Sequence, residues 1–232
     1  MKLKIGVMGA AINHFSDKQL KTAYDLGRAI AGHDCITVTG ACPGLPFEAA
    51  KGASEAGGLV VGISPGLSKW EHINKYRSPV DFHDLLIFTG SGLMGREVVN
   101  IRSSDIVVII GGRSGTLGEF SIAYDEGKLI GVVMGTGGIT SEIRNIIKVI
   151  KKETGARVLY DKNPAALVKK LISYYRKEHY KYPNAYHSFV ERQAQKFPAP
   201  KVAGDVKIAG NGNGAKKSPV KKKTGRRARP QE

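Results

Sequence analysis

The feature that most constrains the fold of this chain is a series of short, uninterrupted apolar segments that alternate with segments of helical periodicity. These apolar segments are 3–8, 35–39, 59–64, 85–89, 105–110, 128–133 and 157–160. Strands that are apolar at every position are typical of a parallel sheet covered on both faces. The alternation with helices therefore predicts an α/β fold, a doubly wound, Rossmann-like parallel sheet in three layers.

Local signals set the expected helix boundaries. Ser16 and Gln19 have the spacing of a capping box, which predicts a helix from about Asp17 to Gly32. Asn163 followed by Pro164 predicts a helix that continues to about Lys177. A long polar loop is expected over 65–84. Further helices are expected over about 47–56, 96–103, 116–126 and 141–153.

The charge of the chain is unevenly distributed. The formal net charge is +16, yet residues 1–150 contain 15 Lys and Arg against 14 Asp and Glu. The excess of basic residues lies in the C-terminal third, and the strongly basic composition therefore does not predict a nucleic-acid-binding fold. We expect a nucleotide-binding domain over 1–178, an extension over 179–197 that packs on it, and a disordered basic tail over 198–232.

The rest of the composition excludes several classes of protein. Two cysteines are too few for a disulfide scaffold. The sequence contains no stretch of about 18 apolar residues and therefore predicts no membrane-spanning helix. We therefore expect a cytoplasmic protein. The basic segment 216–229 predicts non-specific contact with nucleic acid, and its alternative interpretation is a solubilising tail.

Glycine-bearing loops follow four of the predicted strands, at 9–16, 40–46, 90–95 and 111–115. In doubly wound sheets the ligand lies at the carboxyl ends of the strands. The alternative is that these glycines only terminate strands. The ligand interpretation predicts binding by Gly9, Ala10, Gly40, Gly44, Gly112, Arg113, Ser114, Gly115 and Thr116.

The loop GGRSGT, 111–116, is the strongest of these signals because it leads directly into a helix. A helix N-terminus presents unpaired N–H groups and a positive dipole end, which suit a phosphate. Gly112 and Gly115 allow close backbone approach, and Ser114 and Thr116 add hydroxyl donors. The loop matches neither GxGxxG nor GxxxxGK[ST], so neither a dinucleotide fingerprint nor a Walker loop is predicted.

Few other side chains have the spacing that catalysis or metal binding requires. The six histidines show no HxH or HxxxH pattern, Cys35 and Cys42 form no CxxC, and we expect neither a metal nor a cofactor. His14 is either a ligand contact or an exposed loop residue, and Cys42 is interpreted as a small loop residue. Arg96 and Glu119 are candidates whose alternatives are a solvated arginine and a helix-dipole carboxylate.

The stretch MGREVVNIRSSDIVVIIGGRSGTLGEF, 94–120, resembles the core of the LONELY GUY (LOG), or lysine-decarboxylase-like, family. That family has an MHxRK segment followed by PGGxGTxxE. Arg96 takes the arginine position of the first motif. The resemblance extends over about 3–175 and is strongest toward the LOG-like Rossmann branch that resembles molybdenum-cofactor carrier proteins. Positions of the second motif are taken by Gly112, Gly115, Thr116 and Glu119.

The sequence also departs from the family motifs. The Lys of MHxRK is Glu97 here, the Pro of the second motif is Gly111, and its second Gly is Arg113. The resemblance supports a nucleotide-like ligand better than it supports turnover.

The resemblance leaves three functions open and adds an expected assembly. The first function is binding of a nucleotide or phosphorylated nucleotide-like ligand. The second is a cytokinin-activating type of phosphoribohydrolase, in which Arg96 and Glu119 cleave the N-glycosidic bond of a nucleoside 5′-monophosphate. The third is a carrier of a pterin or molybdenum cofactor. The resemblance also implies a homodimer with its sites near the interface.

Overall fold

A computed structural model describes residues 1–12 and 14–178 of the chain. Within these residues seven strands form one sheet in the order β4-β3-β2-β1-β5-β6-β7. Every neighbouring pair is parallel, which confirms the predicted fold class. The strands are β1 (Lys4–Gly9), β2 (Ile36–Thr39), β3 (Val60–Ser64), β4 (Leu85–Phe88), β5 (Ile106–Ile110), β6 (Leu129–Val133) and β7 (Arg157–Asp161).

The central strand of the seven is β1, and β5 lies beside it, pairing with β1 from Ile5↔Ile106 to Gly9↔Ile110 and with β6 on its other side. All five residues of β5 are buried, as are all five of β6. This burial explains why both strands are apolar at every position, since each side chain faces one of two covered layers. The edge strand β4 differs, because three of its four residues are exposed.

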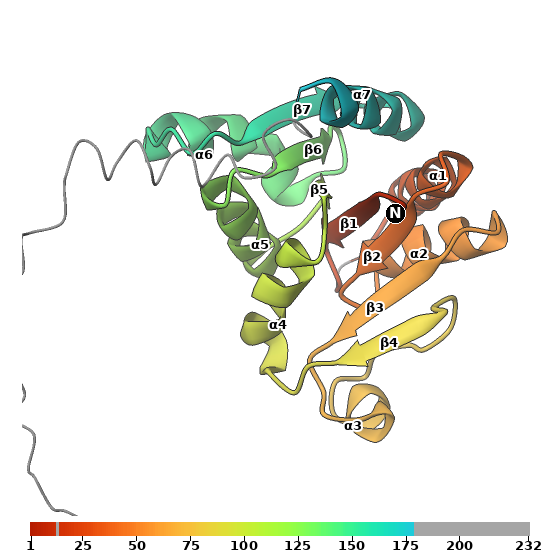
Figure 1. Ribbon diagram of the computed structural model, residues 1–232. Coiled ribbons are helices and arrows are strands. Elements are labelled where there is room, and N and C mark those ends of the chain that lie inside the picture. The colour runs from red at the N-terminus through yellow and green to blue at the C-terminus, as the bar shows by residue number, and fades with distance from the viewer. Residues whose placement is uncertain (13, 179–232) are drawn as a thin grey trace, which may run out of the picture. The chain divides into compact units, whose positions relative to one another are not determined.

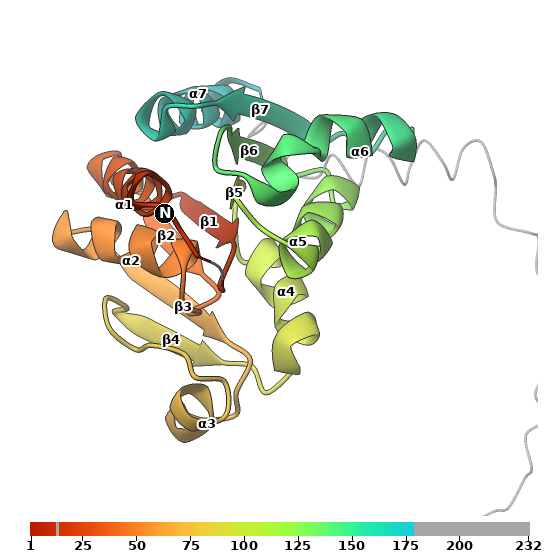
Figure 2. The ribbon, with the colours of Figure 1, turned by 180° about the vertical axis from the view of Figure 1, so that it is seen from behind.

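Helices cover both faces of the sheet, as Figures 1 and 2 show. One layer contains α1 (Asp17–Gly32), α2 (Leu45–Glu55) and α7 (Pro164–Lys177), and its core includes Leu26, Leu45 and Leu171. The other layer contains α4 (Gly92–Arg102), α5 (Ser114–Asp125) and α6 (Ile143–Ile150), and its core includes Ile101 and Phe120. The predicted three layers are therefore present.

The predicted helix caps agree with the structure. Ser16 accepts from the backbone N–H of Gln19, and the Gln19 side chain accepts from the backbone of Ser16, which completes the capping box of α1. Asn163 caps α7 through Ala166. The expectation of a loop over 65–84 was wrong in one part, because α3 (Lys69–Asn74) lies inside it. Ser68 caps α3, and a buried His72 anchors it to Ser64 by a hydrogen bond of 2.8 Å.

Three helices begin earlier than expected, and one of them is α2, which starts at Leu45 rather than near Phe47. The helix α4 starts at Gly92 rather than near Arg96, and α5 starts at Ser114 rather than at Thr116. The starts of α4 and α5 were predicted too late because their first turns contain glycine, which the first turn of a helix tolerates better than its interior does. Arg96 and Glu119 therefore lie in the second turns of their helices.

No helix among residues 1–12 and 14–178 is long and apolar enough to cross a membrane. The expectations for the extension 179–197 and the tail 198–232 fall outside the described residues.

Candidate functional site

A cavity of about 400 Å³ lies beyond the carboxyl ends of β1 and β5. The strand order reverses between these two strands, and open α/β sheets bind ligands at this switch point. The cavity is lined by segments from β1, from the loop after β2, from α2, from α4 and from the start of α5. Its lining residues are Val7, Met8, Gly9, Ala10, Ala11, Ile12, Gly40, Cys42, Pro46, Leu93, Met94, Arg96, Glu97, Arg113, Ser114, Gly115, Thr116 and Glu119.

The N-terminus of α5 forms one end of the cavity. Gly111 and Gly112 both have positive φ, +60° and +104°, and turn the chain from β5 into the helix. Arg113 precedes the helix without a side-chain cap, and no acidic residue lies in the first turn. The backbone N–H groups of this turn therefore meet no side-chain acceptor from the cap, as an anion-binding helix terminus requires.

Arg96 extends from α4 over the loop that follows β2. Its Nη1 donates to the carbonyl of Ile63 at 3.4 Å, and its Nε is buried without a partner among the described residues. Gly40 makes room for the guanidinium, since a Cβ on Gly40 would lie only 1.5 Å from Nη1. The side chain is only 8% exposed, so a positive charge is held inside the cavity wall with much of its donor capacity unused.

Glu119 projects from α5 into the same region and is 7% exposed. Its Oε1 accepts a hydrogen bond from Nδ2 of Asn100 at 3.5 Å, which is a long contact. Burial raises the pKa of Glu119 to about 7, against the opposing charge of Arg96 and with a further contribution from Glu97. A carboxyl group with a pKa near neutrality is suited to proton transfer at physiological pH.

Two titratable residues of the lining had no assigned site role in the sequence analysis. Glu97, also on α4, is 6% exposed, and burial raises its pKa while Arg96 opposes the rise. Cys42 lines the cavity, and burial raises the pKa of its thiol, so the thiolate is disfavoured. The available signal for Glu97 was its helical spacing, because it is adjacent to Arg96 and three residues before Asn100 on α4.

The structure brings together all the predicted site residues except two glycines. Gly112 turns the chain behind the cavity wall, where a Cβ would lie 2.5 Å from that of Thr116. Gly44 has φ +78°, and a Cβ there would lie 2.3 Å from the carbonyl oxygen of Ala10, so it allows α2 to approach the loop after β1. His14 is exposed and is not part of the lining.

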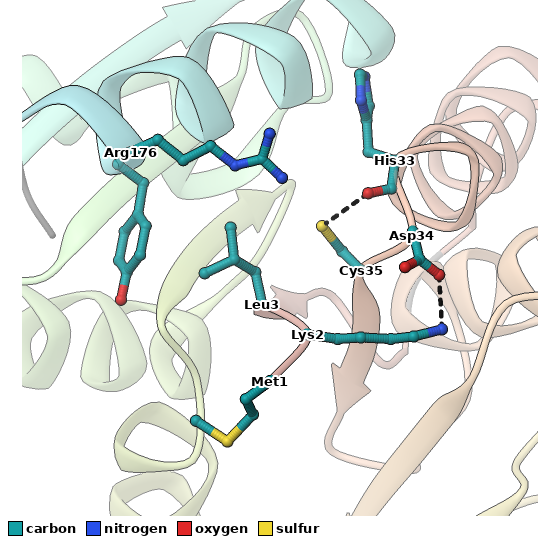
Figure 3. Close-up of a pocket in the computed structure, with 8 residues that line it drawn as sticks. Met1, Lys2, Leu3, His33, Asp34, Cys35 and Arg176 are labelled. Carbon is teal, nitrogen blue, oxygen red and sulfur yellow. Dashed lines mark hydrogen bonds and ion pairs between the residues drawn. The ribbon is translucent and has the colours of Figure 1, made fainter.

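A second cavity, of about 600 Å³, lies at the opposite edge of the sheet, beside the start of β1. Figure 3 shows its residues, among them Leu3, Cys35 and Arg176. Lys2 and Asp34 form an exposed ion pair of 2.6 Å there, and the Cys35 thiol donates to the carbonyl of His33 at 3.5 Å. Although it is larger, this cavity lies at the amino ends of the strands, away from the switch point, and we favour the carboxyl-end cavity as the site.

Comparisons with known proteins agree with this architecture. The model of the SLOG cluster4 family matches residues 2–168. An uncharacterized protein of Archaeoglobus fulgidus is 37% identical over 131 residues, which are 56% of this chain and 80% of the relative. The molybdenum cofactor binding protein of Rippkaea orientalis is similar in structure, with a TM-score of 0.62, 28% identity, and coverage of 75% of this chain and 97% of that one. The molybdenum cofactor carrier protein of Chlamydomonas reinhardtii has a TM-score of 0.61, 31% identity, and coverage of 75% and 99%.

Proposed function

The chain belongs to the SLOG cluster4 family, and from this membership and the carboxyl-end cavity we propose that it binds a phosphorylated, nucleotide-like ligand. The phosphate lies at the uncapped N-terminus of α5, where it accepts from the backbone of Ser114, Gly115 and Thr116. The observation that most supports this proposal is that one cavity contains both that helix end and Arg96, whose buried Nε has no hydrogen-bond partner among the described residues.

The experiment is a thermal-shift comparison of AMP with adenosine. Binding at the helix end predicts that AMP raises the melting temperature and adenosine does not. Ser114→Asp should abolish the AMP shift, because a carboxylate about 4 Å from a phosphate costs roughly 4 kcal/mol at an effective dielectric of 20. The variant itself should stay folded, since an acidic residue in the first turn of a helix is favourable.

Ser121→Asp is the matched control, because Ser121 is exposed on a later turn of the same helix. It should leave the AMP shift unchanged. Equal shifts of the melting temperature by AMP and adenosine would contradict binding of the phosphate at the N-terminus of α5.

Phosphoribohydrolase activity is a second candidate function, favoured by Glu119. A carboxyl group with a pKa of about 7 in the same cavity as Arg96 can move a proton or stabilise positive charge on a ribose during N-glycosidic cleavage. Incubation with AMP would then release free base and ribose 5-phosphate. Glu119→Gln should lower this rate by about 10²–10³ while AMP still binds.

A carrier without turnover is the third candidate, supported by the likeness to two proteins named for the molybdenum cofactor. It predicts tight binding of a ligand that stays chemically unchanged over time. Mass spectrometry of the purified protein for a co-purified ligand distinguishes the candidates directly. A phosphorylated pterin favours the carrier, and a nucleotide favours the first two functions.

We also propose that the protein is a homodimer. Exposed apolar side chains occur along β4 and at the start of α4, and two of them, Leu93 and Met94, also line the cavity. A second copy that covers this surface would complete the cavity wall and shield an apolar edge strand. The residues are Leu85, Ile87, Phe88, Leu93 and Met94.

Sedimentation of the full chain tests the dimer, which should have twice the chain mass of 25.0 kDa. Ile87→Lys should yield monomers, whereas Leu59→Lys, an exposed position before β3, should not. A monomeric wild-type protein at micromolar concentration would contradict the proposal.

The basic segment 216–229 supports one further proposal, non-specific contact with nucleic acid. Such binding should be independent of sequence and should weaken steeply with salt, because it rests on counterion release. Affinity for single-stranded DNA that is unchanged between 50 and 200 mM salt would argue against it.

A further inference from the structure

Glu97 is a buried carboxylate that the described part of the protein leaves without a partner. It is 6% exposed and lines the carboxyl-end cavity. None of the residues 1–12 and 14–178 donates a hydrogen bond to it or forms an ion pair with it. Asn100, on the same helix, donates instead to Glu119 and to Met8.

The position of this carboxylate is built by two glycines of α5. A Cβ on Gly118 would lie 2.8 Å from Oε2 of Glu97, and a Cβ on Gly115 would lie 3.4 Å from Oε1. A larger residue at position 118 would displace the carboxylate. The absence of a side chain at Gly118 therefore leaves space for it. Glu97 therefore lies against the side of α5 that carries these two glycines, whereas the phosphate is placed at the N–H groups of the helix end itself.

The chemistry of a carboxylate limits what can satisfy it there. An ionised carboxylate only accepts hydrogen bonds, and a buried one without donors costs free energy. A phosphate dianion cannot act as the hydrogen-bond partner of Glu97, because two neighbouring negative charges repel and neither group has a proton to donate. With the phosphate at the end of α5, a donor for Glu97 can come from the part of the ligand that is bonded to the phosphate.

In a nucleoside 5′-monophosphate that part is the ribose, whose hydroxyl groups are donors. Carboxylates in Rossmann-type sites bind ribose hydroxyls in this way and disfavour a phosphate in the same place. The end of α5 would then bind the phosphate of the ligand, and Glu97 would bind its sugar.

We propose that Glu97 accepts a hydrogen bond from a ribose hydroxyl of the ligand, and that it excludes ligands with a phosphate at that hydroxyl. The inference rests on the proposed binding of a phosphorylated nucleotide-like ligand. It assigns the ligand to the ribonucleotides rather than the deoxyribonucleotides.

The test is isothermal titration of AMP, 2′-deoxy-AMP, 3′-deoxy-AMP and adenosine 3′,5′-bisphosphate against the full chain. The deoxy analogue that lacks the contacted hydroxyl should bind wild-type protein about 10-fold to 100-fold more weakly than AMP, which is the scale of a hydrogen bond to a charged group. If the 3′ hydroxyl is the one contacted, the bisphosphate should be rejected at least as strongly as 3′-deoxy-AMP.

Glu97→Gln preserves the size of the side chain and removes its charge. It should bring the deoxy analogue within about 3-fold of AMP, since a neutral hydrogen bond is worth much less than a charged one. Glu126→Gln is the control, because Glu126 pairs with Arg102 at 2.7 Å away from the cavity. It should retain the wild-type discrimination.

Wild-type protein that binds AMP and both deoxy analogues equally would overturn the inference and leave the proposed function standing. Discrimination that survives in Glu97→Gln would also overturn it. Failure of AMP to bind better than adenosine would overturn the proposed function itself. The wild-type comparison of ligands decides the matter even if Glu97→Gln does not fold.

Discussion

Charged side chains at the two ends of the strands differ in whether they form ion pairs. We call these ends the amino-end edge and the carboxyl-end edge of the sheet. At the amino-end edge, Nζ of Lys4 and Oδ2 of Asp105 are 2.8 Å apart, the same carboxylate accepts from the backbone of Lys4, and Lys128 donates to the carbonyl of Ser104. At the carboxyl-end edge Arg96, Glu97 and Glu119 are more deeply buried. None of these three forms an ion pair among the described residues, although they line one cavity.

On the proposed function, this difference separates charges that stabilise the fold from charges that are held for a ligand. Paired, partly exposed groups cost little and contribute a modest stability. Buried groups with few partners lower stability, and they persist only where the surrounding structure is strong enough to hold them. The comparison predicts that neutralising a charge has opposite consequences at the two edges.

The largest expected effect concerns the pH dependence of stability through Glu119. Its usual pKa is 4.5 and its pKa in the folded protein is about 7, so between these values the folded protein holds a proton that the unfolded chain has lost. The free energy of unfolding should therefore fall as pH rises through this window, by about 3 kcal/mol, and then level off. Glu119→Gln should remove most of this slope, as measured by urea denaturation at pH 5, 6, 7 and 8.

Glu97 has a raised pKa and adds to the slope in the same direction. Glu126→Gln, which removes an ion pair with Arg102, should keep the wild-type slope. A slope that is identical in wild type and Glu119→Gln would show that Glu119 titrates normally, and the contrast between the edges would lose its main support.

A smaller effect is expected from Gly40→Ala at the carboxyl-end edge. The added Cβ would lie 1.5 Å from Nη1 of Arg96, so the guanidinium must leave its seat. We expect a loss of about 2 kcal/mol in the free energy of unfolding, typical of overpacking, and AMP binding weakened by about 10-fold or more.

Gly32→Ala is the matched control, because Gly32 ends α1 and a Cβ there meets nothing within 4 Å. It should stabilise the protein by up to about 1 kcal/mol, since alanine restricts the unfolded chain. Similar losses of stability in the two variants would contradict the role assigned to Gly40.

The smallest effect belongs to the amino-end edge. Asp105→Asn removes the ion pair with Lys4 but leaves an acceptor for the backbone N–H of that residue. The variant should lose about 1 kcal/mol of stability and bind AMP within 2-fold of wild type. A change in AMP binding comparable with that of Gly40→Ala would break the distinction between the two edges.

Most of the fold could be predicted from the sequence, because its determinants are local and repeated. Solid apolar runs such as 105–110 identify strands that are buried on both faces, and caps at Ser16 and Asn163 set helix starts to within a residue. The helix α3 was missed because it is six residues long and lies among polar residues, where periodicity gives no signal. The starts of α4 and α5 were missed because their first turns contain glycine.

The sequence by itself determined the sheet, the loops that end its strands, and the candidates Arg96 and Glu119. Only the tertiary structure decided which groups share a cavity and which of them lack partners. Glu97 shows why: its helical position is legible in the sequence, but its isolation depends on Gly115 and Gly118 of another helix. Burial and hydrogen bonding are properties of the packed chain, because they depend on atoms that are distant in sequence and meet only when the layers close on the sheet.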